Sequence, residues 1–308
     1  MSELPAVGTR VSLRYRLLAG SAKPLTDVIG HVERISPTVG VRTRSGELVE
    51  VEPAAIVSVR ELSHTPVRAS EIRALEHAAA LAWPGTEQQW LGGWFARAGL
   101  GATSRANSAV PLDMSAQIAD LPALVEWYRR RDLPAWLALP ERLLPIRAAG
   151  IKPARVMVRD VPPGGPDHTA GEGRNIDAQF VSRPDADWLA GYERKVPVEV
   201  LTAVVDGEVT FASVAGSAVG RGAVTPAPDG TRWLGISSVR VAAQARRQGY
   251  ARAVCDALLA WGAAAGAQRA YVQVEVDNAP AIALYSSLGF RLHHQTRYVA
   301  AEDLTTLR

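Results

Sequence analysis

The sequence of 308 residues contains little cysteine and little lysine. Its one cysteine, Cys255, excludes an internal disulfide and lies in an apolar, Ala-rich stretch, so we expect a buried structural thiol. The only lysines are Lys23, Lys152 and Lys195, and arginine supplies the rest of the 34 basic residues. With abundant alanine and glycine, this composition is typical of a GC-rich bacterial coding sequence. The arginine excess therefore does not call for a nucleic-acid partner, and a net charge of +3 gives little support for one.

Long hydrophobic runs are also missing. The sequence shows no stretch of about eighteen apolar residues and no signal-peptide pattern, which predicts a cytoplasmic protein without a membrane partner. A hydrophobic fraction of 47% and a charged fraction of 21% are ordinary for a globular protein. The length indicates two or three domains.

Acidic residues are absent from the start of one predicted helix, although they usually complement a helix N-terminus. A Val-Arg-Val strand at residues 239–241 is followed by a short bend, and residues 246–252 then open a long Ala-rich helix. The unpaired backbone N–H groups of such a turn can bind a diphosphate, and Gly249 allows the ligand a close approach. The alternative is an ordinary helix start in an arginine-rich chain.

A second motif follows about thirty residues later along the sequence. Residues 270–276 alternate as a β-strand does, and Asn278 is a favourable N-cap for the helix that follows. Pro280 is tolerated in the first turn of that helix, and Gly289 is a typical C-terminal stop. Tyr285 lies nearly two turns after Asn278, so both side chains project from similar sides of the helix.

An Arg-x-x-Gly-x-Ala turn after a Val-x-Val strand, then a strand and Asn-x-x-Ala-x-x-x-Tyr-x-x-x-Gly-Phe, resembles the GNAT superfamily of acyl-CoA-dependent N-acyltransferases. The match covers about residues 180–308 and is densest from 236 to 298. The resemblance implies an α+β fold with a central mixed, mostly antiparallel sheet flanked by helices. It implies acetyl-CoA as cosubstrate, without a metal, and acetyl transfer to a primary amine of a small molecule or peptide by direct attack in a ternary complex.

The resemblance also implies roles for particular residues. Asn278 contacts the coenzyme arm, and Tyr285 protonates the departing CoA thiolate. The strand that splays to pair with the pantetheine and the turn that binds the pyrophosphate correspond to Val239, Arg240, Val241, Arg246, Arg247, Gln248, Gly249, Tyr250, Ala251 and Arg252. The structural alternatives are a buried strand, a plain N-cap and a core tyrosine.

The chain departs from the family pattern at the position of the general base. Several members carry a glutamate five residues before the Asn, where this chain has Gln273, which cannot accept a proton. Glu275 lies on the same strand face and is our candidate base, acting through water, with a solvated surface charge as the alternative. The missing glutamate also motivates an alternative function, a catalytically weak acetyl-CoA-binding sensor or scaffold. His293 and His294 are expected at a strand surface or pocket rim, not as metal ligands.

The region before residue 178 is organised differently. Residues 1–67 contain short strands and tight turns typical of a small SH3-like β-barrel, a rigid addition or a contact for a protein partner or second copy. Residues 68–160 predict helices at 70–81, 121–131 and 141–149 and strands within 90–112 and at 134–139 and 156–161. This order parallels the C-terminal region and suggests a degenerate GNAT-like half that shapes the acceptor cleft. An unrelated α/β insertion is the alternative.

The remaining residues complete the expected domain plan. Residues 161–177 are rich in proline and glycine and predict a flexible linker before the catalytic domain at 178–308. Within that domain a helix is expected at 185–195. Strands are expected at 198–205 and 208–215, joined as a hairpin at Asp206-Gly207.

Overall fold

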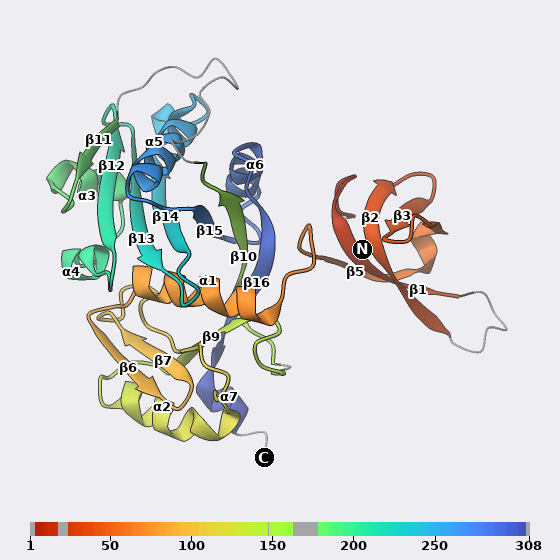
Figure 1. Ribbon diagram of the computed structural model, residues 1–308, viewed down its shortest axis with the longest axis horizontal. Helices are drawn as coiled ribbons and strands as arrows, with labels where there is room; N and C mark the ends of the chain where they lie inside the picture. The colour runs from red at the N-terminus through yellow and green to blue at the C-terminus, as the bar shows by residue number, and fades with distance from the viewer. Residues whose placement is uncertain (1–3, 18–23, 147, 163–177, 306–308) are drawn as a thin grey trace. The chain divides into compact units, whose positions relative to one another are not determined.

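The computed structural model describes residues 4–17, 24–146, 148–162 and 178–305 (Figure 1). The chain divides into two compact units, Met1–Val67 and Arg68–Arg308. Nearly all of the expected linker, residues 163–177, lies outside the described residues.

The N-terminal unit is one antiparallel sheet with the strand order β4-β3-β2-β1-β5. Its elements are β1 (Arg10–Arg16), β2 (Leu25–Arg34), β3 (Val39–Thr43), β4 (Leu48–Val51), η1 (Pro53–Ala55) and β5 (Ile56–Glu61). The alternation along β1 buries Val11 and Leu13 completely, and they pack against Val28, Val32 and Val41 from the neighbouring strands. The prediction of a small all-β domain at the N-terminus is confirmed.

The second unit is built on an eight-stranded sheet with the order β11-β12-β13-β14-β15-β10-β16-β9. Its strands are β9 (Trp136–Pro140), β10 (Ile151–Asp160), β11 (Ala178–Val181), β12 (Glu208–Val214), β13 (Ala218–Pro226), β14 (Arg232–Val241), β15 (Arg269–Glu275) and β16 (Arg291–Ala300). Neighbouring strands are antiparallel except β14 and β15, which run parallel. The predicted mixed, mostly antiparallel sheet is therefore confirmed.

Helices cover both faces of this sheet (Figure 1). On one face lie α1 (Ala69–Ala82), α3 (Ala186–Tyr192) and α4 (Val198–Thr202), and on the other lie α5 (Tyr250–Ala264) and α6 (Ala279–Ser287). Helix α5 packs very closely on β13, because a Cβ atom at Gly220 would lie only 2.5 Å from Cγ1 of Val254. A short 3-10 turn, η3 (Ala243–Ala245), precedes α5.

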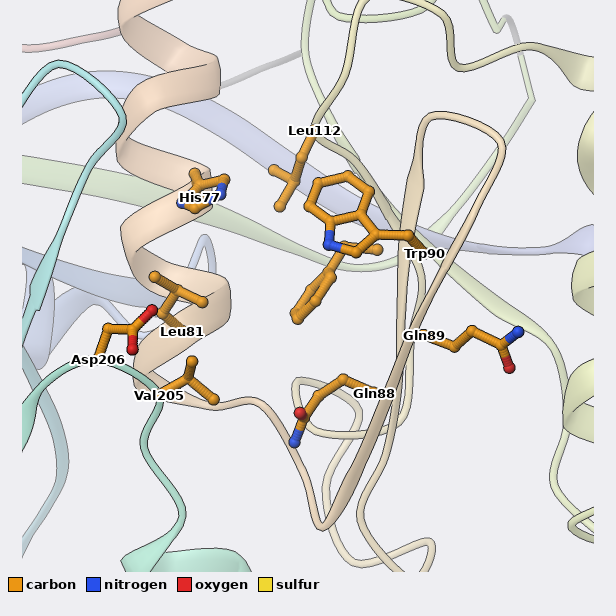
Figure 2. Close-up of a pocket in the computed structure, with 9 residues that line it drawn as sticks. His77, Leu81, Gln88, Gln89, Trp90, Leu112, Val205 and Asp206 are labelled. Atoms are coloured by element: carbon orange, nitrogen blue, oxygen red, sulfur yellow. The ribbon is translucent and has the colours of Figure 1, made fainter.

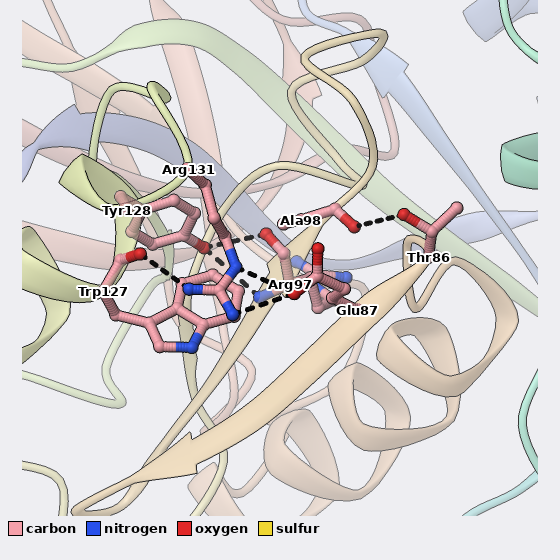
Figure 3. A network of polar contacts seen from close by, with 7 residues as sticks. All are labelled: Thr86, Glu87, Arg97, Ala98, Trp127, Tyr128 and Arg131. Carbon is pink, nitrogen blue, oxygen red and sulfur yellow. Dashed lines mark hydrogen bonds and ion pairs between the residues drawn. The ribbon is translucent and has the colours of Figure 1, made fainter.

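A smaller sheet packs beside the edge strand β9. It consists of β6 (Glu87–Leu91), β7 (Trp94–Ala98) and β8 (Val110–Pro111), with η2 (Ile118–Asp120), α2 (Leu121–Arg129) and α7 (Ala301–Thr305) around it. Figure 3 shows how α2 is joined to this sheet. Tyr128 Oη donates to the Arg97 carbonyl at 3.0 Å, and Arg131 lies 3.7 Å from the Trp127 ring centroid while it pairs with Glu87 at 2.8 Å.

Residues 68–160 and residues 178–308, which the sequence predicts as separate domains, belong to one compact unit. Strand β10, from the first region, pairs with β15 on one side and β16 on the other, both from the second. Its backbone and side chains therefore complete the core of the main sheet. The degenerate GNAT-like half stays a prediction, but its residues do not form a unit of their own.

Two predicted elements are wrong. Residues 141–144 form a turn and residues 145, 146 and 148–150 are irregular, because Pro145 removes a helix donor and Arg142 adopts a φ of 67°. The expected strand at 198–205 begins instead as α4, with Pro197 as its N-cap residue. Strand β12 therefore forms its hairpin with β13 and not across Asp206-Gly207.

A buried polar chain joins α1 to β16. Nδ1 of His293 lies 2.8 Å from Nδ1 of His294, and Nε2 of His294 lies 2.8 Å from Oε1 of Glu76. The histidines are 4% and 0% exposed, so the expected surface position is wrong. The cause is a register shift: Val156 faces His294 and Met157 faces Leu292, so His293 is an extra residue that breaks the alternation of the strand.

Because of these buried histidines, we expect the protein to lose stability in acid. Burial, and then the neighbouring His294, lowers the pKa of His293 to about 3, whereas an unfolded histidine titrates near 6.5. Below pH 6.5 the unfolded state alone binds the proton, so the free energy of unfolding falls by up to about 1.4 kcal/mol per pH unit. Urea denaturation between pH 6.5 and 4.5 should show a shallower decline for His293→Gln than for the unsubstituted protein. Parallel declines would contradict this assignment.

Candidate active site

Strands β14 and β15 separate in the middle of the main sheet. Their parallel pairing ends at Ile236 and Val272, whereas β14 continues to pair with β13 as far as Val241. Ser238 adopts a φ of 56°, next to a register shift in the β13–β14 ladder. The edge of residues 237–241 that would face β15 is therefore free to pair with an extended ligand. This is the arrangement expected for Val239, Arg240 and Val241.

The turn after β14 leads into the N-terminus of α5. Gly249 is the N-cap residue with a φ of 88°, a left-handed conformation that favours glycine, and no atom lies within 4 Å of the place of a Cβ. The first turn of α5 contains no acidic residue. Among the described residues, the backbone N–H groups of 247–252 have no backbone acceptor, whereas Ala253 N–H reaches the Gly249 carbonyl at 3.0 Å. These N–H groups and the positive end of the helix dipole suit an anion.

Two side chains at this turn form hydrogen bonds with neutral groups rather than ion pairs with acids. Nη2 of Arg252 donates to Oγ of Ser287 at 2.6 Å, which ties α5 to α6, and the Gln248 side chain donates to the Gln244 carbonyl at 3.0 Å. Tyr250 is half-buried, and Arg246 and Arg247 are exposed. Residues 246–249 of the turn are therefore exposed to solvent.

Helix α6 carries the second motif. Oδ1 of Asn278 accepts from the backbone N–H of Ala281 at 3.3 Å, so Asn278 is the N-cap, as the sequence predicts. Tyr285 is 8% exposed, and its ring packs at 65° against Phe290. Burial raises the pKa of Tyr285, the Cys255 thiol adds to the rise, and the charge of Arg105 opposes it. The phenol therefore keeps its proton at neutral pH.

One cavity of about 840 Å³ unites these features. Its lining includes Val239, Arg240, Val241, Ala251, Gln273, Glu275, Asn278 and Tyr285. The structure thus brings both motifs of the sequence to one site. Arg246, Arg247, Gln248, Gly249, Tyr250 and Arg252 are not among its lining residues and lie on the adjoining turn.

The site contains few groups that could act as a general base. Gln273 is half-buried and Glu275 is exposed at the end of β15, and both line the cavity. In the part of the chain that the structure describes, Glu275 is the only carboxylate in this lining. No group of three or more His, Cys, Asp or Glu side chains among the described residues is arranged to hold a metal ion.

A second part of the cavity wall carries none of the predicted site residues. This wall comes from residues before 160 and from β16, and it includes Trp83, Thr103, Ser104, Arg105, Lys152, Thr296 and Tyr298. One signal was available: two of the only three lysines, Lys152 and Lys195, line the cavity of a chain that otherwise uses arginine. The rest depends on contacts between residues far apart in the sequence.

A second, smaller cavity of about 420 Å³ lies between α1, the β6–β7 hairpin and Asp206 (Figure 2). The rings of His77 and Trp90 are 6.4 Å apart there, and burial lowers the pKa of His77. None of the residues that match the two GNAT motifs lines this cavity. The larger cavity is therefore the candidate active site.

Known proteins match this chain along most of its length. A family model described as "Probable histone acetyltransferase Rv0428c C-terminal" matches residues 69–299, and one described as "Rv0428c N-terminal Sm-like domain" matches residues 5–60. The chain is 48% identical over 307 residues to the probable histone acetyltransferase Rv0428c of Mycobacterium tuberculosis, covering 99% of this chain and 98% of the relative. It is 26% identical over 250 residues to the uncharacterized N-acetyltransferase YobR of Bacillus subtilis, covering 71% and 94%.

A solved structure of similar fold is a GCN5-related N-acetyltransferase from Kribbella flavida. Its TM-score is 0.53 at 17% identity, covering 77% of this chain and 96% of that chain. Fold and comparisons together define an acyltransferase of the GNAT superfamily, which confirms the resemblance in the sequence. Within it, the chain belongs to the family of the probable histone acetyltransferase Rv0428c, whose N-terminal domain is Sm-like. No helix within the described residues has the length and apolar character to cross a membrane.

Proposed function

We propose that this protein transfers the acetyl group of acetyl-CoA directly to a primary amine. The observation that carries the proposal is that two features of one cavity and the turn adjoining it lie together. These are the free edge of β14, the N–H-bearing turn before α5, and the buried, protonated Tyr285. The first two fit the amides and phosphates of a coenzyme A, and the third fits the sulfur that must leave.

The chain's own groups then account for the proton movements. The neutral amine attacks the thioester carbonyl carbon, and an oxyanion forms as the new C–N bond is made. When the C–S bond breaks, the thiolate takes the proton of Tyr285 Oη. The proton lost by the amine passes to Glu275 through water, since Gln273 cannot accept it. Both groups return to their starting states by exchange with solvent.

The function is tested by mixing the full-length protein with acetyl-CoA and a panel of primary amines and titrating the released thiol. The panel should hold small amines, amino acids and a lysine-rich peptide, because the name of the Mycobacterium tuberculosis relative includes a histone substrate. We expect release that depends on the amine. Coenzyme binding by calorimetry without release for any amine would favour the alternative, a sensor or scaffold that keeps the pocket and lacks Glu at position 273.

Gly249→Val should weaken acetyl-CoA binding about tenfold. A β-branched residue at a φ of 88° costs roughly 1–2 kcal/mol, and relief of that strain moves the N–H groups of the turn. Calorimetric titration with acetyl-CoA measures the effect. Gly230→Val is the matched control, since Gly230 has a φ of 82°, has equally open surroundings and lies outside the cavity. Equal losses of affinity in the two variants would contradict a coenzyme role for the turn.

A further inference from the structure

The charge of the cavity wall is strongly positive. Five cationic side chains line it, Arg105, Lys152, Arg194, Lys195 and Arg240, against the single carboxylate of Glu275 among the described residues. Arg240 forms an ion pair at 2.6 Å with Glu193, which does not line the cavity. Two of the other cations, Arg105 and Lys152, lie on the wall formed by residues before 160, whereas the coenzyme features come from β14, α5 and α6.

Arg105 is the cation most deeply placed in this wall. Its Nε atom is buried and has no hydrogen-bond partner, and no ion pair to its guanidinium is found in the described part of the chain. Its Cζ atom lies 5.8 Å from the centroid of the Trp83 ring. Burial raises the pKa of Tyr285 and of Tyr298, and the charge of Arg105 opposes the rise in each. The guanidinium therefore lies within electrostatic range of the acid.

The loop that carries Arg105 is held rigidly. Oδ1 of Asn107 accepts from Gly99 N–H at 2.8 Å and Gly101 N–H at 3.0 Å, and its amide donates to the Thr103 carbonyl at 2.7 Å. The buried guanidinium of Arg97 donates to both the carbonyl and the hydroxyl of Ser108 at 3.1 Å. These bonds fix the backbone on either side of Arg105 before any ligand arrives.

Lys152 adds a second cation to the same wall. Its Nζ donates to Oγ of Ser104 at 2.7 Å, which ties β10 to the residue next to Arg105. Lys152 adopts a φ of 48°, an unfavourable backbone conformation for a residue with a Cβ. An ammonium and a guanidinium with no acid between them suit a ligand that supplies the negative charge.

We infer that the acceptor is an amine that also carries a carboxylate or phosphate group, and that Arg105 binds this group. The inference rests on the proposed acetyl transfer and specifies its acceptor class. A half-buried guanidinium that lines the cavity offers paired N–H donors that match two oxygens of one anion. The same wall disfavours a lysine-rich peptide, because several like charges would meet in a partly dry cavity.

The test compares amines that differ only in charge. Glycine, β-alanine and 4-aminobutyrate are each assayed against their amides, and O-phosphoethanolamine against ethanolamine, with a lysine-rich peptide as the cationic probe. We expect the charged member of at least one pair to be preferred. Arg105→Gln should lower kcat/KM for that member by roughly 30-fold or more and change its neutral partner less than about threefold.

Arg291→Gln is the matched control, because Arg291 is exposed and outside the cavity, and it should leave both values unchanged. A preference for neutral amines or for the peptide would overturn the inference while leaving acetyl transfer intact. So would an Arg105→Gln variant that loses acetyl-CoA affinity as strongly as acceptor turnover, since Arg105 would then serve the coenzyme.

Calorimetry separates this inference from the proposed function. The same amines are titrated into the protein saturated with CoA. Binding of an anionic amine that Arg105→Gln abolishes supports the anion subsite even if no acetyl transfer occurs. If no amine is acetylated and none binds in an Arg105-dependent way, both the proposed function and this inference are wrong.

Discussion

Tyr285→Phe should lower kcat by roughly 100-fold or more and leave the dissociation constant of acetyl-CoA nearly unchanged. The substitution removes only the phenolic proton, and general acids contribute about 10²–10⁴-fold to such reactions. Because burial raises the pKa of Tyr285, the loss should persist across neutral pH. Steady-state release of thiol with the best acceptor, and calorimetry with acetyl-CoA, measure the two quantities.

The matched control is Tyr271→Phe. Tyr271 is also a buried tyrosine, with a pKa that burial raises to about 12, but it packs against Trp233 and does not line the active-site cavity. We expect near-normal kcat for this variant. If Tyr285→Phe turned over as fast as Tyr271→Phe, Tyr285 would be a core residue, and the sensor or scaffold alternative would gain.

Arg221→Ala should cost about 3–5 kcal/mol of the free energy of unfolding, the largest stability effect that we expect from one side chain. Arg221 is 0% exposed and donates to the carbonyls of Leu201 at 2.7 Å, Ala82 at 2.8 Å and Ala203 at 3.0 Å. Its truncation leaves three carbonyls without this donor and opens a void beneath Trp83. Urea denaturation measures the loss.

The charge and the hydrogen bonds of Arg221 explain why this arginine is tolerated in the core. Burial lowers the pKa of Arg221 to about 9, so the guanidinium stays charged at neutral pH and can bond all three carbonyls. Ala82 ends α1, Leu201 lies in α4 and Ala203 follows it, so Arg221 fixes both helices on β13. Arg221→Lys should restore only part of the stability, since an ammonium cannot span three acceptors in a plane. A melting temperature within about 1 °C of the unsubstituted protein for Arg221→Ala would contradict this account.

The elements that the sequence predicts correctly are those with local signals. The helix at 69–82 has a capping box in which Arg68 N–H donates to Glu71 at 2.6 Å, and α6 has its Asn cap and glycine stop. The wrong elements are those where long-range contacts replace local ones. The carbonyls of Ile146 and Ala148 accept from Arg297 instead of closing a helix, and the carbonyls of Leu201 and Ala203 accept from Arg221.

The half of the cavity that the two motifs form was predictable, and the wall that carries Arg105 was not. Residues 239–252 and 278–285 form continuous motifs, since a strand edge and a helix N-terminus bind through their own backbone. Arg105, Trp83 and Lys152 line the cavity only because of long-range contacts. Strand β10 is inserted between β15 and β16, and hydrogen bonds of Asn107 hold the loop at 99–109 in place. Pairing partners of that kind leave no periodic trace in the sequence.

The sequence alone determined the family, the order of most strands and helices, and the two motifs proposed to bind the coenzyme, because each depends on neighbours within a few turns of chain. The tertiary structure decided that residues 68–308 form one unit, that two adjacent histidines meet inside it, and that a guanidinium lies near Tyr285. Those outcomes depend on strand insertion, a register shift and burial, which arise only when distant segments pack together.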